Sequence, residues 1–162
     1  MRAQRSGVIA NLGSIGGWRA LPLIGWYTAT KFAVAGITTS LRAEVAPLGI
    51  DVTCVDLGSF RTSLLYGNMA VAERKIADLA PCVEPTRQFL AARGGKQPSD
   101  PRKAAQLLVE ALTKTGRCAD RALPARLALG KDSIGAARAV METAEQELAA
   151  WADLASTTDF DE

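Results

Sequence analysis

The sequence contains no histidine among its 162 residues. Histidine is the side chain that most often serves as a general base near neutral pH, and it is also the commonest metal ligand. Acid–base chemistry at neutral pH must therefore use a tyrosine, a lysine, a cysteine or a carboxylate whose proton affinity the fold has changed. For the same reason we expect no metal site.

An excess of one charge, a long apolar run and paired cysteines are also missing. The chain has 19 Lys and Arg against 17 Asp and Glu, so its net charge of +2 gives no electrostatic case for a nucleic-acid partner. No apolar run approaches the roughly 20 residues that a membrane span needs, and the basic N-terminus lacks the apolar core of a signal peptide. Three cysteines without CxxC spacing favour a reduced, cytoplasmic setting.

Hydrophobic residues make up 48% of the chain, which is enough for one domain with a core. Short apolar runs predict buried strands over residues 7–11, 49–56 and 125–130. Apolar residues that recur every three or four positions predict helices over residues 26–45, 101–116 and 131–153. Strand and helix alternate, so we expect an α/β fold with a parallel sheet and crossover helices.

The ends of the middle helix, the segment 63–98 and the bounds of the domain can also be predicted. Asp100 or Ser99 can cap the middle helix, Pro101 suits its first position, and Gly116 can end it. Residues 63–98 are expected to form short helices and mobile loops. One domain would cover residues 1–155, and the acidic residues 156–162 would be disordered.

The last helix carries a stripe of apolar residues. Packing of this stripe against the sheet is favoured over a seam between subunits. Its members are Ile134, Ala137, Met141, Ala144, Leu148 and Trp151.

The stretch "GWYTATKFAVAG" places Tyr27 and Lys31 one helical turn apart on the same face of the first helix. A free phenol titrates near 10, and a neighbouring ammonium favours the phenolate, so the pair makes sense as a general acid–base. The spacing alone is weak evidence, because Tyr-x-x-x-Lys often arises by chance. Ser14, in the loop after the first strand, strengthens the case for a site. Ligands bind at the carboxyl ends of parallel strands, where a hydroxyl can hydrogen-bond a substrate oxygen. The alternative for Ser14 is an ordinary loop serine bonded to its own backbone.

Three stretches together resemble the short-chain dehydrogenase/reductase family. They are "MRAQRSGVIANLGSIGG", "YTATK" and "LRAEVAPLGIDVTCVDLGSFRT", which occur at the family's spacing from Met1 to about Thr62. The resemblance implies a partial Rossmann-like sheet whose strands correspond to the family's fifth, sixth and seventh. It also implies an NAD or NADP cofactor and hydride transfer between an alcohol and a ketone or aldehyde.

The resemblance assigns roles to residues as well. Tyr27 would exchange the proton, Ser14 would orient the substrate oxygen, and Lys31 would bind the nicotinamide ribose. The family's Pro-Gly-x-x-x-Thr loop reads Leu57-Gly58-Ser59-Phe60-Arg61-Thr62 here, so the nicotinamide would contact Gly58, Phe60 and Thr62, with a leucine in place of the proline. An apolar alcohol or carbonyl substrate would lie against Ser14, Ile15, Trp18, Trp26, Leu64 and Leu65, with Leu21, Pro22, Tyr66 and Met69 as further candidates. For the two tryptophans a core position is an equally good interpretation.

The family's Gly-rich pyrophosphate turn and the asparagine of its fourth helix have no counterpart in the sequence. The resemblance therefore predicts the C-terminal half of such an enzyme, without the N-terminal cofactor-binding half. The "GVIAN" strand would then have an open edge. Two alternatives remain: a non-catalytic remnant or interaction protein that pairs through this edge, with a second copy or a complementing N-terminal half, and an unrelated α/β protein with a chance Tyr/Lys pair.

Overall fold

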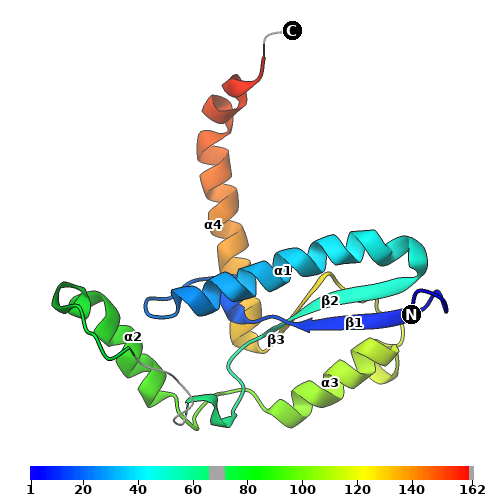
Figure 1. The fold of residues 1–162 in the computed structure, drawn as a ribbon, viewed down its shortest axis with the longest axis horizontal. Helices are drawn as coiled ribbons and strands as arrows, with labels where there is room; N and C mark the ends of the chain where they lie inside the picture. The colour runs from blue at the N-terminus through cyan, green and yellow to red at the C-terminus, as the bar shows by residue number, and fades with distance from the viewer. Residues whose placement is uncertain (66–71, 161–162) are drawn as a thin grey trace.

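The computed structural model describes residues 1–65 and 72–160. Its centre is a parallel sheet with the strand order β1-β2-β3, formed by Gly7–Leu12, Ile50–Leu57 and Arg126–Leu129 (Figure 1). Each strand lies within about a residue of its predicted range at either end. The predicted α/β class, with three parallel strands and helices between them, is confirmed.

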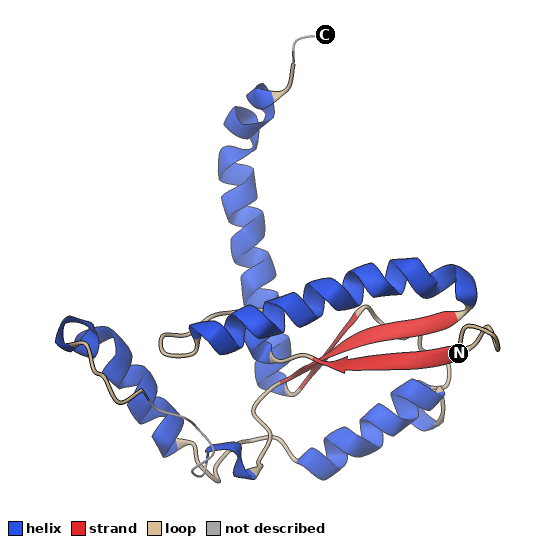
Figure 2. Ribbon diagram, in the orientation of Figure 1, coloured by secondary structure: helices blue, strands red, loops and turns tan. Residues whose placement is uncertain are grey.

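The described parts of the chain contain four α-helices. α1 spans Gly25–Val45, α2 spans Ala80–Ala92, α3 spans Pro101–Thr113 and α4 spans Lys131–Ala155. α1 and α3 lie on opposite sides of the strands, and α4 runs away from them (Figure 2). Within the described residues, no helix combines the length and the apolar character that crossing a membrane requires.

The core lies around β2, the central strand. Val52, Cys54 and Val55 are fully buried, as is expected of a parallel strand that is covered on both faces. α1 packs on β2 through Ala35 and Thr38, and Arg42 of the same helix donates to the carbonyl oxygens of Val52 and Leu123. The long helix is therefore fixed to the sheet along much of its length, including the end that carries the predicted site.

The segment 63–98 contains more helix than the sequence predicted. α2 is 13 residues long, and short 3-10 turns occur at Ser63–Leu65 and Ala77–Leu79. Its two prolines obscured the helical pattern. One lies in the first turn, where a backbone N–H needs no partner, and the other, Pro85, lies inside the helix. Tyr66 and Met69, two further substrate-wall candidates, lie outside the described residues.

α3 begins as predicted and ends earlier than predicted. Asp100 caps it by accepting a hydrogen bond from the backbone N–H of Arg102 at 2.8 Å, and Pro101 is its first residue. Gly116 does not end the helix. Lys114 takes the left-handed conformation instead, with φ 52°, and its ammonium lies 2.9 Å from the carboxylate of Asp51, an ion pair that ties the helix end to β2.

Among the residues that the structure describes, α4 packs on the other elements only through its first turns. Ser133, Ala136 and Ala137 are buried there, and the helix contacts β3 and the turn at Ile15–Gly17. Beyond Ala137 it leaves the sheet, so Met141 and Leu148 are 53% and 68% exposed. The prediction that the whole apolar stripe packs on the sheet is therefore wrong. A four-residue strand, β3, is too short to support a helix of 25 residues.

Candidate active site

The predicted site lies at the carboxyl ends of β1 and β2. Because the two strands are parallel neighbours, the loops that follow them emerge at the same edge of the sheet. One loop carries Ser14, and the other covers residues 58–62. The first turns of α1, which carry Tyr27 and Lys31, reach the same edge, because Lys31 Nζ donates to the carbonyl oxygen of Leu12, the last residue of β1, at 2.9 Å.

Tyr27 and Lys31 share one face of α1, as their spacing predicts. The ammonium of Lys31 lies 5.7 Å from the centroid of the Tyr27 ring, and the ring is 42% exposed. Thr28, between them in the sequence, points inward and is buried. The pair therefore faces away from the core, with the phenol accessible from solvent and a cation beside it.

Ser14 is buried at the start of a 3-10 turn formed by Ile15–Gly17. Its Oγ accepts a hydrogen bond from the backbone N–H of Gly16 at 3.0 Å, which is the local bond that the ordinary-serine alternative anticipates. Because Oγ is the acceptor in this bond, the hydroxyl proton is still available for a second partner.

Ser14 and Tyr27 both lie close to Gly16. A Cβ added at Gly16 would lie 3.0 Å from Cε1 of Tyr27 and 3.5 Å from Oγ of Ser14. The phenol ring and the serine hydroxyl therefore both lie close to the same small residue. Together with Lys31, the three predicted catalytic side chains gather at the end of β1.

The loop after β2 is held from behind by α4. Oδ2 of Asp132 accepts a hydrogen bond from the backbone N–H of Ser59 at 2.7 Å, and a Cβ at Gly58 would overlap Oδ1 of the same carboxylate. Burial raises the pKa of Asp132, but the hydrogen bonds from Ser59 and from nearby backbone N–H groups outweigh it, so the pKa lies below its ordinary value. Phe60 also forms a parallel bridge to Ser99. The loop predicted to contact the nicotinamide is thus supported on two sides.

The remaining predicted site residues are distributed over three segments. Thr62 is exposed, and its Oγ1 accepts a hydrogen bond from the backbone N–H of Leu64, which is 58% exposed in the turn Ser63–Leu65. Leu65 and Ile15 are half-buried, and Trp26 is 91% exposed beside Tyr27. A shallow hollow of about 340 Å³ lies elsewhere, between α3 and the segment before β3, and none of these residues lines it.

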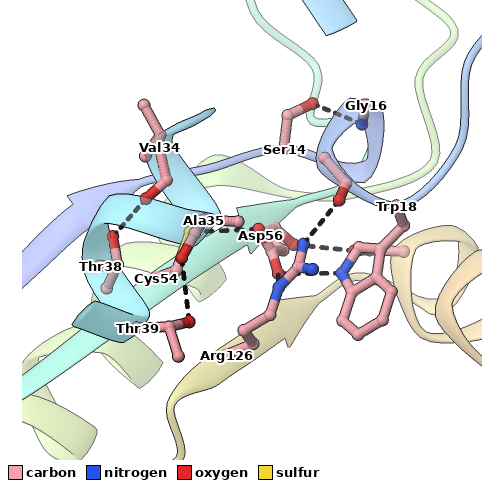
Figure 3. A network of polar contacts seen from close by, with 12 residues as sticks. Ser14, Gly16, Trp18, Val34, Ala35, Thr38, Thr39, Cys54, Asp56 and Arg126 are labelled. Atoms are coloured by element: carbon pink, nitrogen blue, oxygen red, sulfur yellow. Dashed lines mark hydrogen bonds and ion pairs between the residues drawn. The ribbon is translucent and has the colours of Figure 1, made fainter. Parts of the chain in front are cut away.

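Trp18 takes a different position from the other substrate-wall candidates. Its indole N–H donates to Oδ2 of Asp56 at 2.9 Å, and the guanidinium of Arg126 stacks on its ring at 3.6 Å from the centroid. Nε of Arg126 donates to the same carboxylate oxygen at 2.7 Å (Figure 3). Trp18 is therefore part of a polar cluster against the sheet.

This cluster was not predicted from the sequence. Asp56 is fully buried, and it also contacts the thiol of Cys54, with Sγ 3.4 Å from Oδ1. Burial, and then the charge of Asp56, raise the pKa of Cys54 to about 11. The sequence did contain a signal: Asp56 and Arg126 each lie in a strand that was predicted to be buried, and buried charges need partners.

Comparison with known proteins gives a family match for part of the chain. Residues 1–70 match the model of the short chain dehydrogenase family, which is 70 of the 162 residues and includes Ser14, Tyr27, Lys31 and the loop after β2. Oxidoreductase BOA17 of Botryotinia fuckeliana is 29% identical over 160 residues, which cover 95% of this chain and 54% of that protein. The chain thus spans about half the length of this curated relative.

Solved structures share the fold. A short-chain dehydrogenase from Streptomyces avermitilis is 35% identical, with a TM-score of 0.81 over 98% of this chain and 55% of that one. A short chain dehydrogenase from Mycobacterium paratuberculosis, solved with NAD bound, is 21% identical, with a TM-score of 0.57 over 82% of this chain and 47% of that one. At that identity the likeness concerns the fold alone. These relatives and structural neighbours are oxidoreductases and short-chain dehydrogenases.

Proposed function

We propose that the chain carries the catalytic residues of a short-chain dehydrogenase, an NAD(P)-dependent oxidoreductase that interconverts an alcohol and a ketone or aldehyde. One observation carries the proposal: Ser14, Tyr27 and Lys31 gather at the carboxyl end of β1 around Gly16. The family match covers these residues and supports the same reading. Because the chain spans about half of its relative, the proposal concerns the site that the chain contains.

Each side chain has a task in this reaction. In alcohol oxidation, the carbon-bound hydrogen leaves as hydride and the oxygen-bound proton passes to the Tyr27 oxygen; reduction runs both steps in reverse. The Lys31 cation beside the ring stabilises negative charge on that oxygen. Ser14, whose hydroxyl proton is not used by Gly16, donates to the substrate oxygen and holds it near the phenol.

The donors at this edge fit the nicotinamide end of a dinucleotide. The Lys31 ammonium has three N–H donors, and its hydrogen bond to Leu12 uses one, which leaves donors for ribose hydroxyls. The exposed Thr62 hydroxyl would face the carboxamide, beside the loop of Gly58 and Phe60. The N–H groups of Gly58 and Phe60 already donate to the carbonyl oxygens of Leu129 and Gly58, so these two residues would contribute contacts and not donors. When bound, a nicotinamide supplies or accepts the hydride. The match of residues 1–70 to the short chain dehydrogenase family supports the cofactor class, and both NAD and NADP remain candidates.

The substrate would be an apolar alcohol or carbonyl compound. Trp26, 91% exposed, and Leu64, 58% exposed, offer apolar surface close to the site in sequence. Large exposed aromatic and aliphatic side chains beside polar catalytic groups suit a ligand with an apolar body and one reacting oxygen.

The three free cysteines support the expectation of a reducing, cytoplasmic compartment.

Replacement of the phenol tests the proposal. Tyr27→Phe removes the proton carrier, so kcat for NADH- or NADPH-dependent reduction of an apolar ketone should fall at least about 100-fold. The absorbance of the reduced nicotinamide measures it, and Lys31→Met should lower the rate as well. Lys103→Met, which removes an exposed lysine on α3, is the matched control and should leave the rate unchanged. Turnover that survives Tyr27→Phe, or no binding of NADH and NADPH to the chain, would refute the proposal.

The open edge of the sheet supports a second candidate, an interaction module. β1 pairs with β2 on one side only, and it is the outer strand of the described sheet. An edge of this kind is a template for another strand, supplied by a second copy or by a complementing segment. Sedimentation at increasing concentration would detect self-pairing, and a strictly monomeric chain would exclude pairing with a second copy.

A further inference from the structure

The turn that carries Ser14 has no backbone hydrogen bonds to the sheet among those that the structure describes. Its backbone bonds are internal: Gly17 N–H donates to the Ser14 carbonyl, and Trp18 and Arg19 N–H donate to the Ile15 carbonyl. Ser14 is nevertheless buried, so the turn sits firmly against its surroundings. Side chains must therefore set its position relative to the strands.

Asp56 is the point on β2 to which the turn is attached. Its carboxylate is fully buried and accepts hydrogen bonds from the indole N–H of Trp18 and from Nε of Arg126, both on Oδ2. Trp18 follows the turn directly, so the first bond joins the end of the turn to the central strand. A buried carboxylate with two donors in place is held in one orientation.

Arg126 joins the same turn to β3. Besides its bond to Asp56, its Nη2 donates to the carbonyl oxygen of Gly17 at 3.0 Å, and its guanidinium stacks on the Trp18 ring (Figure 3). One planar side chain thus contacts a carboxylate, a turn carbonyl and an indole face at once, a combination that lysine cannot reproduce. The turn is therefore connected to β2 through Asp56 and to β3 through Arg126.

Two glycines bring the turn close enough for these contacts. A Cβ at Gly13 would overlap Oδ1 of Asp56 and would lie 2.6 Å from Sγ of Cys54. A Cβ at Gly17 would lie 3.0 Å from the Lys31 carbonyl oxygen and 3.3 Å from Nη2 of Arg126. Close packing on both sides of Ser14 therefore transmits the position of the Asp56 carboxylate to the serine hydroxyl.

We propose that Trp18, Asp56 and Arg126 are positioning residues that hold the Ser14 hydroxyl at the Tyr27 ring. The inference rests on the proposed function for its catalytic consequence. None of the three side chains is required to touch the substrate. They act through the turn, and a displacement of the reacting groups by about 1 Å can lower a rate by about 100-fold.

Trp18→Phe is the mildest test, because it removes the indole donor and keeps an aromatic ring for Arg126. The amide proton of Gly16, which donates to Ser14 Oγ, should exchange with solvent at least about tenfold faster in this variant, while the amides of β2 stay unchanged. Nuclear magnetic resonance measures both. Trp151→Phe, on the exposed part of α4, is the matched control and should change neither.

Steady-state kinetics distinguish a positioning role of Trp18 from a general structural role. Trp18→Phe should lower kcat about tenfold and leave KM for the cofactor within about twofold. In a Ser14→Ala background it should have no further effect, because the group that it positions is gone. An equal loss of kcat in both backgrounds would overturn the inference in favour of a general structural role.

The two measurements also separate this inference from the proposed function. If the wild-type chain shows no nicotinamide-dependent turnover, the proposed function fails, and the exchange of the Gly16 amide still decides whether the cluster holds the turn. If Trp18→Phe does not fold, the wild-type protein decides: the Trp18 indole N–H must exchange more slowly than that of Trp151. Equal exchange of these two indoles, or unchanged Gly16 exchange in Trp18→Phe, would overturn the inference.

Discussion

Asp132 holds the loop after β2 through its bond to the Ser59 N–H, and the pH dependence of this contact can be predicted. Its pKa is lowered in the folded state, so its contribution to stability is present above the unfolded pKa of about 4 and is lost as pH falls through the folded value. Asp132→Asn should therefore lower the free energy of unfolding at pH 7 by about 1 kcal/mol, with solvent screening of the half-buried carboxylate included. Urea denaturation at pH 7 and pH 3 measures the difference, which should shrink at pH 3. An equal difference at both values would contradict the assignment.

The cysteines should differ sharply in reactivity. Burial and the neighbouring charge of Asp56 raise the pKa of Cys54 to about 11, so its thiol is protonated at pH 8 and is also inaccessible. Cys118 is buried, and Cys82 is exposed on α2. A thiol reagent should label one cysteine rapidly in the native protein and all three after unfolding. Cys82→Ser should remove the rapid phase, and a rapid phase that persists would show that the region around Cys54 or Cys118 opens.

At the scale of elements, α4 has two parts with different surroundings. Its first turns are packed through Ser133, Ala136 and Ala137, and its later turns carry Leu148, Trp151 and Leu154, each more than 60% exposed. Nothing in the described structure covers that later face. Its apolar residues therefore contribute little to the stability of the chain as described.

A pair of matched substitutions tests this division. Leu148→Ala should change the free energy of unfolding by less than about 0.5 kcal/mol, because its side chain is already in solvent. Leu129→Ala, in β3, removes a buried side chain and should cost about 2–5 kcal/mol. Chemical denaturation measures both. A cost for Leu148→Ala close to that for Leu129→Ala would show that the later turns of α4 are packed in solution.

For the molecule as a whole, the sheet has one central strand and two outer strands. In the described residues β2 pairs on both sides, whereas β1 and β3 each pair on one side only. The chain also spans about half the length of the curated relative whose alignment covers 95% of this chain. The predicted site thus lies next to a strand whose outer backbone groups can accept another chain.

Hydrogen exchange along the strands reports on this edge. The amides of β2 should be the most protected, and alternate amides of β1, those pointing away from β2, should exchange quickly. The measurement is made at low and at high protein concentration. Uniform protection of β1 at low concentration would contradict an open edge, and protection that appears only at high concentration would identify self-pairing.

Local patterns in the sequence predicted most of the elements and named the residues of the candidate site. Apolar periodicity located three strands and three of the helices, because the pattern that a strand or helix buries recurs within a few residues. Tyr27 and Lys31 share a face for the same local reason. Over residues 63–98 only short helices were expected, because two prolines interrupt the pattern of the 13-residue α2. Gly116 was a wrong helix end because Lys114 takes the left-handed conformation two residues earlier.

How distant segments meet depends on the tertiary arrangement of the chain. Trp18 turns toward Asp56, 38 residues away, and Arg126 reaches Asp56 and Gly17 across 70 and 109 residues. The later turns of α4 have a helical apolar stripe without a sheet beneath it. Periodicity reports that a side chain prefers burial, but the partner that buries it depends on the arrangement of the whole chain, which no local pattern contains.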